Sequence, residues 1–416
     1  MDTVEVLIIG AGPVGLLSAV ALAQLGVDVM VVEAEAGLND SPRAAVHFAT
    51  TLVPIRDLGL LEDLEARSLK VRSFGFHAPA FDFHPVLSMS CMSGITFDYQ
   101  LHCGQDVVGR IAMTHAERRG ARVRFSHRLV GLSQEAEYVH ADVQTTDGMK
   151  RIKADWVIGA DGARSTVREL LGLEFLGHTW PNRFVATNIY CDMAAYGYQP
   201  SNFICDPLYG GVVAQLDEAG LWRLTYHESG AHPVGSFMER LPEKFAGFFP
   251  RGAPYRIKAA QPYVIHQRCA ERLRVGRVLL AGDAAHATNP CGGLGLTTGV
   301  WTGMILTDLL GAVLRCEEDQ TVLDRYCKER RRIFWDVTSP GASENKRMME
   351  EGDREQRLKD IEGVKLMASD PQVARLMMAF PFKVIGDPLR EASRWRNADP
   401  TARAGIAVEK RASQLA

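Results

Sequence analysis

The N-terminal segment constrains the fold of this chain more than any other part of it. Residues 4–9 form an apolar run, typical of a buried strand, that leads into a glycine-rich turn at residues 10–15 with the sequence GAGPVG. An apolar helix pattern continues to about Leu25, and a second apolar run, residues 27–32, ends at Glu33. Strand, glycine-rich turn, helix and strand in this order predict a βαβ unit of a parallel sheet.

The glycine spacing in this turn is typical of dinucleotide-binding proteins, and each glycine has a physical role. Gly10 permits the tight turn, Gly12 lets the backbone approach a pyrophosphate, and Gly15 lets the helix pack closely on the strand. The helix N-terminus presents N–H groups and a positive dipole end to the phosphates. Glu33 is placed to accept hydrogen bonds from ribose hydroxyls. The residues assigned to this site are Gly10, Gly12, Val14, Gly15, Glu33 and Ala34.

Composition and cysteine spacing argue against several other classes of protein. The chain has 416 residues, enough for two or three domains, and its net charge of −3 gives no sign of a nucleic-acid partner. Its eight cysteines include no CxxC pair, which fits neither a zinc site nor a disulfide framework and suggests reduced thiols in the cytoplasm. No apolar stretch approaches the length of a membrane span, so we expect no membrane association. We also expect no metal site, and a monomer or homodimer.

Strand patterns of another kind interrupt the dinucleotide-binding part. Aromatic residues alternate with turn residues over positions 71–99, and with β-branched residues over positions 175–266. A long helix is predicted from about Leu296 to Leu314, and polar residues after about Ala398 predict a loosely ordered end. The resulting division assigns residues 1–72, 102–174 and 267–345 to the dinucleotide-binding domain, residues 73–101 and 175–266 to a mainly β substrate domain, and residues 346–416 to a C-terminal helical segment. Because the two sheets are interleaved along the sequence, we expect one compact body.

Two further motifs stand at fixed places after predicted strands. Residues 161–168 read DGARSTVR, and residues 282–286 read GDAAH and are followed by Pro290 and the turn GGLG at residues 292–295. With the N-terminal motif, these resemble over most of the chain the class A flavin monooxygenases, the para-hydroxybenzoate hydroxylase-like family. The resemblance implies an α/β fold with a Rossmann-like FAD-binding domain, one bound FAD, NADH or NADPH as co-substrate, and insertion of one atom of O2 into an organic substrate.

The resemblance also implies roles for individual residues. Asp283 accepts a hydrogen bond from a ribityl hydroxyl of FAD, and Asp161 with Gly162 forms a motif shared by FAD and the nicotinamide cofactor. Arg43 contacts the cofactor phosphates or ribose, and Gln105, at a predicted helix start, contacts the ribityl chain. The glycine turn has little side-chain bulk, so its backbone can approach the isoalloxazine ring. The residues assigned there are Pro290, Gly293, Leu294, Gly295 and Leu296.

The chain departs from the family pattern at two positions beyond this turn. Thr297 stands where the family usually has Asn, and Thr302 stands where it usually has Asp. We expect these changes to alter local hydrogen bonds near the flavin rather than to abolish binding.

The chemistry implied by the resemblance requires a dry pocket for an electron-rich acceptor. The distal oxygen of a flavin C4a-hydroperoxide is electrophilic, so a phenol or hydroxypyridine must be deprotonated, which asks for a base or hydrogen-bond relay. His47, after the Arg43 loop, is the first candidate to touch the substrate. Alternation along residues 221–228 places two further candidates on one face and a third on the other. These candidates are Arg223 and His227 on one face and Tyr226 on the other, with Asn188 and Tyr190 on an earlier strand.

The sequence therefore predicts an FAD-dependent, NAD(P)H-consuming monooxygenase that hydroxylates a small aromatic or heteroaromatic substrate with O2. The same motifs also fit oxygenation of a polycyclic natural product or antibiotic by hydroxylation, epoxidation or Baeyer–Villiger insertion. A flavin-linked reductase or dehydrogenase that reacts poorly with O2, and a flavoprotein that sequesters a ligand, are the other readings left open. Fold analogy does not identify the substrate.

Overall fold

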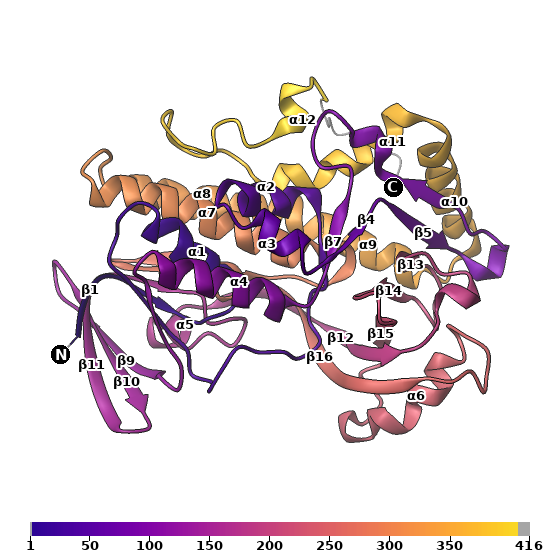
Figure 1. The fold of residues 1–416 in the computed structure, drawn as a ribbon, viewed down its shortest axis with the longest axis horizontal. Coiled ribbons are helices and arrows are strands. Elements are labelled where there is room, and N and C mark those ends of the chain that lie inside the picture. Colours follow the sequence, from indigo (N-terminus) through magenta and orange to yellow (C-terminus); the bar gives the residue numbers. More distant parts are fainter. Residues whose placement is uncertain (1, 407–416) are drawn as a thin grey trace.

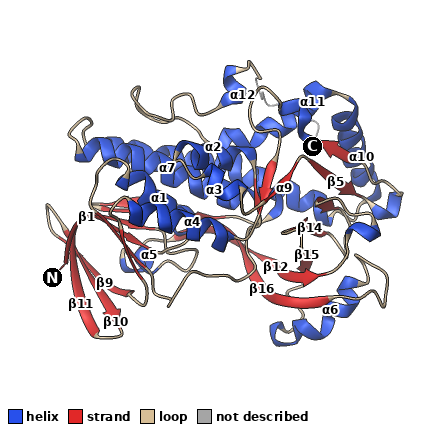
Figure 2. Ribbon diagram, in the orientation of Figure 1, coloured by secondary structure: helices blue, strands red, loops and turns tan. Residues whose placement is uncertain are grey.

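The computed structural model describes residues 2–406, and they form a helix-covered, largely parallel sheet beside a second, mainly antiparallel sheet (Figures 1 and 2). The predicted α/β fold class is confirmed. The polar end predicted after Ala398 extends into residues 407–416, which lie outside the described residues.

The first sheet contains the predicted βαβ unit. β1 pairs in parallel with β2 on one side and with β11 on the other, and β18 and β8 extend the parallel part outward. Residues 6–9 of β1 and all of β2 and β18 are apolar and buried, because both faces of the sheet are covered there. The strand order is β17-β18-β11-β1-β2-β8, and β9 and β10 form a hairpin on β11. The bounds are β1 Asp2–Ile9, β2 Val29–Val32, β8 Arg122–Arg124, β9 Arg128–Gln134, β10 Val139–Thr145, β11 Gly148–Gly159, β17 Arg274–Val275 and β18 Val278–Leu280.

The second sheet joins two distant parts of the sequence. Its central pair, β12 and β16, is long and antiparallel, and β5 reaches the sheet by pairing in parallel with β13. The order is β19-β16-β12-β15-β14-β13-β5-β6. The bounds are β5 Ser73–His77, β6 Val86–Ser88, β12 Phe175–Tyr190, β13 Ser201–Ile204, β14 Gly211–Gln215, β15 Leu221–Glu228, β16 Arg256–Ala270 and β19 His286–Ala287. Both stretches with alternating aromatic residues therefore contribute strands to one sheet.

A small third sheet connects the cofactor-binding motifs with the second sheet. Its order is β3-β7-β4, and both pairings are antiparallel. The bounds are β3 Val46–His47, β4 Leu69–Val71 and β7 Gln100–His102. β3 directly follows the loop that carries Arg43, so this sheet fixes the far end of that loop.

The longest helix, α7, runs through the core and corrects one expectation. The segment Cys291–Leu314 is long and apolar enough to cross a membrane, with a mean hydropathy of 1.3, so the prediction that no stretch approaches that length was wrong. The segment is apolar because it is a core helix: 83% of its most apolar window is buried. α7 packs against α1, α2 and α8 in the layer that covers the first sheet (Figure 1).

The remaining helices cover the two sheets. α1 and α4 pack side by side against the first sheet, and α10 and α11 lie beside β5 at the other end of the molecule (Figure 1). The bounds are α1 Pro13–Ala23, α2 Ala49–Asp57, α3 Leu61–Glu65, α4 Gln105–Arg118, α5 Thr166–Leu170, α6 Phe237–Phe245, α7 Leu294–Leu314, α8 Val322–Ile333, α9 Ser339–Glu350, α10 Arg354–Ser369, α11 Pro371–Ala379 and α12 Pro400–Arg403. Short helical turns include η2 Met89–Met92, η5 Gly282–Ala284 and η6 Cys291–Gly293.

Candidate functional site

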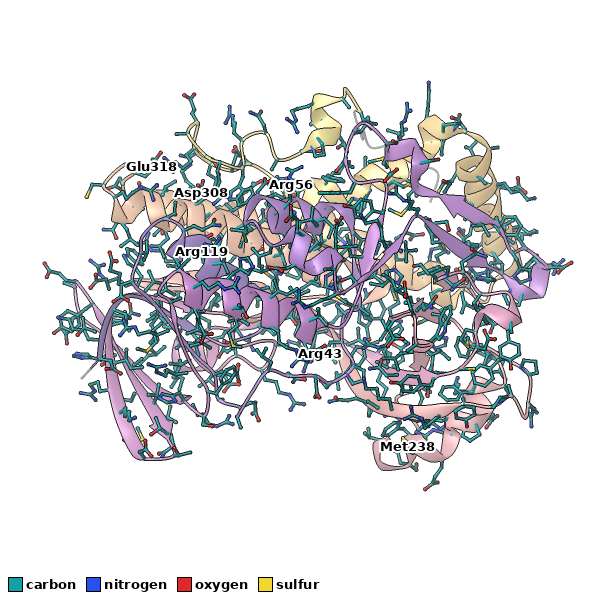
Figure 3. The ribbon with its side chains drawn as sticks, viewed as in Figure 1. Arg43, Arg56, Arg119, Met238, Asp308 and Glu318 are labelled. Carbon is teal, nitrogen blue, oxygen red and sulfur yellow. The ribbon has the colours of Figure 1, made fainter. Side chains whose placement is uncertain are left out.

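A cavity of about 920 Å³ lies at the carboxyl ends of the parallel strands and continues to the inner face of the second sheet. Ile9 of β1 and Val32 of β2 line one end, and Val212 and Thr225 of the second sheet line the other. Arg43, labelled in Figure 3, lies on the loop between these two parts of the molecule. In open α/β sheets the carboxyl edge is where ligands bind.

The N-terminal glycines have the geometry that the motif predicts. Gly10 has φ +107°, a backbone conformation that disfavours any side chain, and a Cβ at Gly15 would overlap the Gly10 carbonyl oxygen. A Cβ at Gly12 would meet no protein atom within 4 Å. Gly10 and Gly15 are therefore required by the protein's own packing, whereas Gly12 leaves free space at the cavity wall for a ligand to approach the backbone.

Glu33 lies at the end of β2 and supports the glycine turn. Its Oε2 accepts a hydrogen bond from the backbone N–H of Ala11 at 2.8 Å, and its Oε1 accepts one from the N–H of Glu35 at 3.0 Å. Each carboxylate oxygen has a further lone pair, and Glu33 and Ala34 both line the cavity. Glu33 can thus hold the turn and accept a ribose hydroxyl together.

The motif at residues 161–168 forms a hydrogen-bonded corner at the cavity wall. Asp161 accepts from the Ser165 hydroxyl at 2.5 Å and from the Val167 N–H at 3.0 Å, and burial raises the pKa of its carboxyl. The Arg168 guanidinium donates to the carbonyl oxygens of Ala163 at 2.7 Å and Ala284 at 3.1 Å. Arg168 therefore ties this motif to the one at residues 282–286, a role that sequence reasoning did not assign.

Asp283 points into the cavity from the helical turn after β18. Its side chain is open to the cavity, but the surrounding protein keeps it away from bulk solvent. This burial raises the pKa of the carboxyl, and the positive charge of Arg43 opposes that rise. Gln105, the first residue of α4, lines the same part of the cavity with Asp161 and Gly162. The ionic and amide groups of this end fit a ligand with hydroxyls and phosphates.

The glycine turn before α7 brings backbone to the cavity wall. Gly292 and Gly293 have φ of +78° and +64°, and a Cβ at Gly293 would overlap the Phe48 ring. The two departures from the family pattern are satisfied locally. The Thr297 hydroxyl donates to the Gly293 carbonyl at 3.0 Å, and Thr302 pairs with His286 at 2.8 Å.

These residues fit FAD. All of the residues assigned to the cofactor from sequence line the cavity, except Gly15, which packs within the βαβ unit, and Leu294, which is buried in the core. The open space at Gly12, the carboxylates of Glu33 and Asp283 and the glycine turn at α7 are separate observations that agree with one extended dinucleotide. The described residues contain no His, Cys, Asp or Glu group able to hold a metal ion.

Arg223 is the one substrate candidate of the four assigned from sequence that lines the cavity. Its Nε donates to Asn188 Oδ1 at 2.6 Å, and its Nη1 donates to the backbone carbonyl of Arg43. The side chain is buried, which lowers the pKa of the guanidinium to about 10 and still leaves it cationic at neutral pH. Asn188 therefore acts by holding Arg223, and Tyr190 lies outside the cavity lining, stacked with Arg256.

His47 does not face the cavity. Its neighbours Val46 and Phe48 line the cavity, and strand alternation directs His47 to the opposite side, where it is 1% exposed. Neither ring nitrogen has a hydrogen-bond partner among the described residues, and burial lowers the pKa of His47 to about 4. His47 is thus a neutral core residue at pH 7.

The remaining two candidates lie away from the cavity. Tyr226 is completely buried in the apolar cluster on the opposite face of β15, with Trp222 and Leu224. His227 shares the face of Arg223 but lies beyond the cavity lining, close to Lys244 and Glu350. The alternation predicted for this strand holds, and it separates Tyr226 from Arg223.

Several cavity residues carried no sequence motif. Tyr263 of β16 lines the cavity beside Arg223, and burial raises the pKa of its phenol. Asn202 of β13 and Asn345 of α9 are polar residues of the same end. They come from elements that reach the cavity only in the folded chain, so no local spacing signals them.

Comparisons with known proteins agree with this site. Residues 3–340 match the profile of a family described as FAD binding domain. The chain is 40% identical to para-nitrophenol 4-monooxygenase of Pseudomonas sp. strain WBC-3, over 90% of this chain and 94% of that protein. It is 38% identical to 6-hydroxy-3-succinoylpyridine 3-monooxygenase of Pseudomonas putida S16, over 82% and 88%. The crystal structure of p-nitrophenol 4-monooxygenase from Pseudomonas putida DLL-E4 superimposes with a TM-score of 0.89 at 38% identity, covering 93% of this chain and 99% of that one.

Proposed function

Because this chain belongs to the FAD-binding domain family and is an FAD-dependent aromatic monooxygenase, we propose that it hydroxylates a one-ring phenol or hydroxypyridine. The substrate is held with its ring oxygen against Arg223. The names of the two relatives at 40% and 38% identity support this class, since one acts on a nitrophenol and the other on a hydroxypyridine.

The observation that carries this proposal is the state of the Arg223 guanidinium. Both of its hydrogen bonds go to neutral oxygens, those of Asn188 and of the Arg43 backbone, so its charge is not neutralised by them. A buried cation without a bound carboxylate favours an anionic ligand beside it. A phenol there ionises more easily, because the cation stabilises the phenolate and lowers the pKa of the substrate hydroxyl.

The chain's other residues bind and orient the reactants. FAD, when bound, accepts electrons from NAD(P)H and activates O2 for transfer to the substrate. Glu33 and Asp283 hold the two ends of the dinucleotide, and the glycine turn before α7 lets backbone reach the flavin ring. Phe184 and Val212 supply apolar walls near Arg223, which help to exclude water from the reacting atoms.

A turnover screen of the FAD-loaded enzyme tests this proposal. We expect 4-nitrophenol, 4-chlorophenol or a 2-hydroxypyridine to accelerate oxidation of NADH or NADPH and to yield a product that contains one added oxygen atom, measured by oxygen uptake and mass spectrometry. Comparing NADH with NADPH in the same assay identifies the preferred co-substrate.

Three other results would contradict the proposal. Acceleration only by polycyclic aromatic compounds would assign the enzyme to natural-product oxygenation. Substrate conversion without oxygen uptake would indicate a reductase or dehydrogenase. Bound FAD without any ligand-stimulated oxidation of NAD(P)H would indicate a protein that sequesters its ligand.

A further inference from the structure

The cavity has a second part that the proposed function does not use. It lies between two segments that are far apart in sequence: residues 74–97, which include β6 and η2, and residues 348–381, which include α10 and α11. α11 packs against η2 and α10 packs against β6. In Figure 1 these helices lie beside β5 at the end of the molecule away from β1. We call this part of the cavity the methionine arm.

Every cavity-lining residue from these two segments is apolar. Met89 and Met92 line one wall, and the opposite wall is lined by Met348, Met349, Met367, Met377 and Met378. Half of the chain's 14 methionines thus face one cavity. Phenylalanine, leucine, valine and proline side chains supply the rest of the lining within these segments.

The methionine arm differs chemically from the cofactor end, which is the part of the cavity at the carboxyl ends of the parallel strands. That end presents Glu33, Arg43, Asp161 and Asp283 to the cavity, whereas the described lining of the methionine arm contains no side-chain nitrogen or oxygen. The nearest polar lining residue of the C-terminal helices is Asn345, which lies against Gly292 of the flavin-side turn. A charged group in the arm would lose its hydration without gaining a partner.

Methionine also gives this arm a particular mechanical property. Its side chain is unbranched and has a polarizable sulfur, so a wall of methionines adapts to ligands of different shape and contacts aromatic rings favourably. The two walls contact each other through sulfur atoms, with Cys91 Sγ 3.4 Å from Met378 Sδ. A hydrogen bond from Arg375 Nε to the Cys91 carbonyl at 2.8 Å also joins α11 to the same turn.

We propose that the methionine arm is the subsite for an uncharged, apolar substituent on the substrate ring. The inference rests on the proposed function, since it takes Arg223 as the group that holds the ring oxygen. It narrows the substrate class to phenols or hydroxypyridines with alkyl, halogen or similar neutral substituents. The arm also disfavours phenols that carry a carboxylate on the ring, because the carboxylate would have no cation to pair with there.

A binding series on the oxidised holoenzyme tests the arm without requiring turnover. The ligands are phenol, 4-methylphenol, 4-ethylphenol, 4-propylphenol and 4-hydroxybenzoate, and the measurement is the perturbation of the bound-flavin absorbance. Each added methylene should lower Kd about fourfold until the arm is full. The carboxylate of 4-hydroxybenzoate should raise Kd by more than about a hundredfold relative to 4-ethylphenol.

Substitutions in the wall sharpen the test. Met377→Lys places a cation in the arm and should reverse the preference, improving 4-hydroxybenzoate and weakening 4-propylphenol. Met238→Lys is the matched control, since Met238 is 46% exposed on α6, which packs on the outer face of the second sheet, away from the cavity (Figure 3). Met367→Ala, which adds no charge, should weaken 4-propylphenol several-fold while leaving phenol unchanged, and it covers the case in which Met377→Lys does not fold.

The outcomes separate this inference from the proposed function. If phenols bind and are hydroxylated, but Kd is insensitive to the substituent and to both arm variants, the arm is not a substrate subsite. Tight binding of 4-hydroxybenzoate by the unmodified enzyme would overturn the inference in the same way. If no phenol binds or is oxidised, the proposed function fails and this inference fails with it.

Discussion

The two ends of the cavity are built in different ways. The cofactor end is made from three short motifs, at residues 10–15, 161–168 and 282–295, each in the loop after a parallel strand. The substrate end is made from single residues of the second sheet and of the C-terminal helices, such as Arg223 and Met377. The phosphates and riboses of a dinucleotide favour a recurring set of backbone and carboxylate contacts in this fold, whereas a substrate pocket only has to match one small molecule. The first end is therefore identified by motif, and the second only from the folded structure.

The largest effect that would sharpen this comparison is expected at Arg223. Arg223→Met removes the only charge assigned to the substrate and should lower kcat/KM for the preferred phenol by about a hundredfold or more, as loss of an anion-stabilising donor does in other enzymes. The bound phenol should also ionise at higher pH, because the cation that favours phenolate is gone. The absorbance of bound 4-nitrophenolate, followed against pH, measures that shift directly.

Arg223→Lys serves as the matched variant. It keeps the charge but loses the planar fork that contacts both Asn188 and the Arg43 carbonyl, so it should restore the pKa of the bound phenol more than it restores kcat/KM. FAD content is measured in both variants, because Arg223 also donates to the backbone carbonyl of Arg43, which is assigned to the cofactor. An Arg223→Met enzyme with unaltered kcat/KM would remove the guanidinium from the substrate site.

The next largest effect is expected at the cofactor end. Asp283→Ala removes a carboxylate that points into the cavity, and the loss of a hydrogen bond to a charged group corresponds to about 1.5–3 kcal/mol. The Kd for FAD should therefore rise about ten- to a hundredfold, measured by titrating apoprotein with FAD and following flavin fluorescence. Asp147→Ala, in the exposed hairpin turn of β10 and β11, is the control. An unchanged Kd for FAD would show that Asp283 does not contact the flavin dinucleotide.

The same difference explains what could be predicted from the sequence. The βαβ unit, the helix α7 and the strands around Arg223 follow from local patterns, because burial on one or both faces imposes a period on the sequence. The motifs placed Gly12, Glu33 and Asp283 at one cavity for the same local reason. Arg168 and Tyr263 were missed because their roles depend on residues that come close only in the folded chain. Arg168 donates to Ala284, 116 residues away, and Tyr263 lies near Arg223 of another strand.

Two examples show where local sequence patterns are insufficient. A short strand such as β3 has two faces, and sequence proximity to the Arg43 loop could not tell which face His47 occupies. The helix α7 has the composition of a membrane span, and only its burial between other elements shows that it is a core helix. The methionine arm has no motif at all, since its two walls are about 250 residues apart in the chain and meet through tertiary packing.

The smallest effect on catalysis is expected at His47, because its side chain is buried behind the cavity wall and does not line the cavity. Its effect is expected on stability instead. Its folded-state pKa of about 4 lies below the usual 6.5, so between these values the unfolded chain binds a proton that the folded chain excludes. Stability is therefore fully present above about pH 6.5 and is lost as the pH falls towards 4, by up to about 3 kcal/mol for this one group. His102 behaves in the same direction, since burial lowers its pKa to about 4 as well.

His47→Gln removes one of these titrations while keeping a side chain of similar polarity. The thermal midpoint of the holoenzyme should fall less steeply between pH 7 and pH 5 in this variant than in the unmodified protein, and the exposed His232→Gln should leave the slope unchanged. The ratio of hydroxylated product to NAD(P)H consumed should stay at its normal value, because the ring of His47 lies behind the cavity wall formed by Val46 and Phe48. If His47→Gln instead diverts oxygen to H2O2 at normal stability, the histidine acts on the substrate. β3 would then belong to the substrate end of the cavity, together with the second sheet and the C-terminal helices.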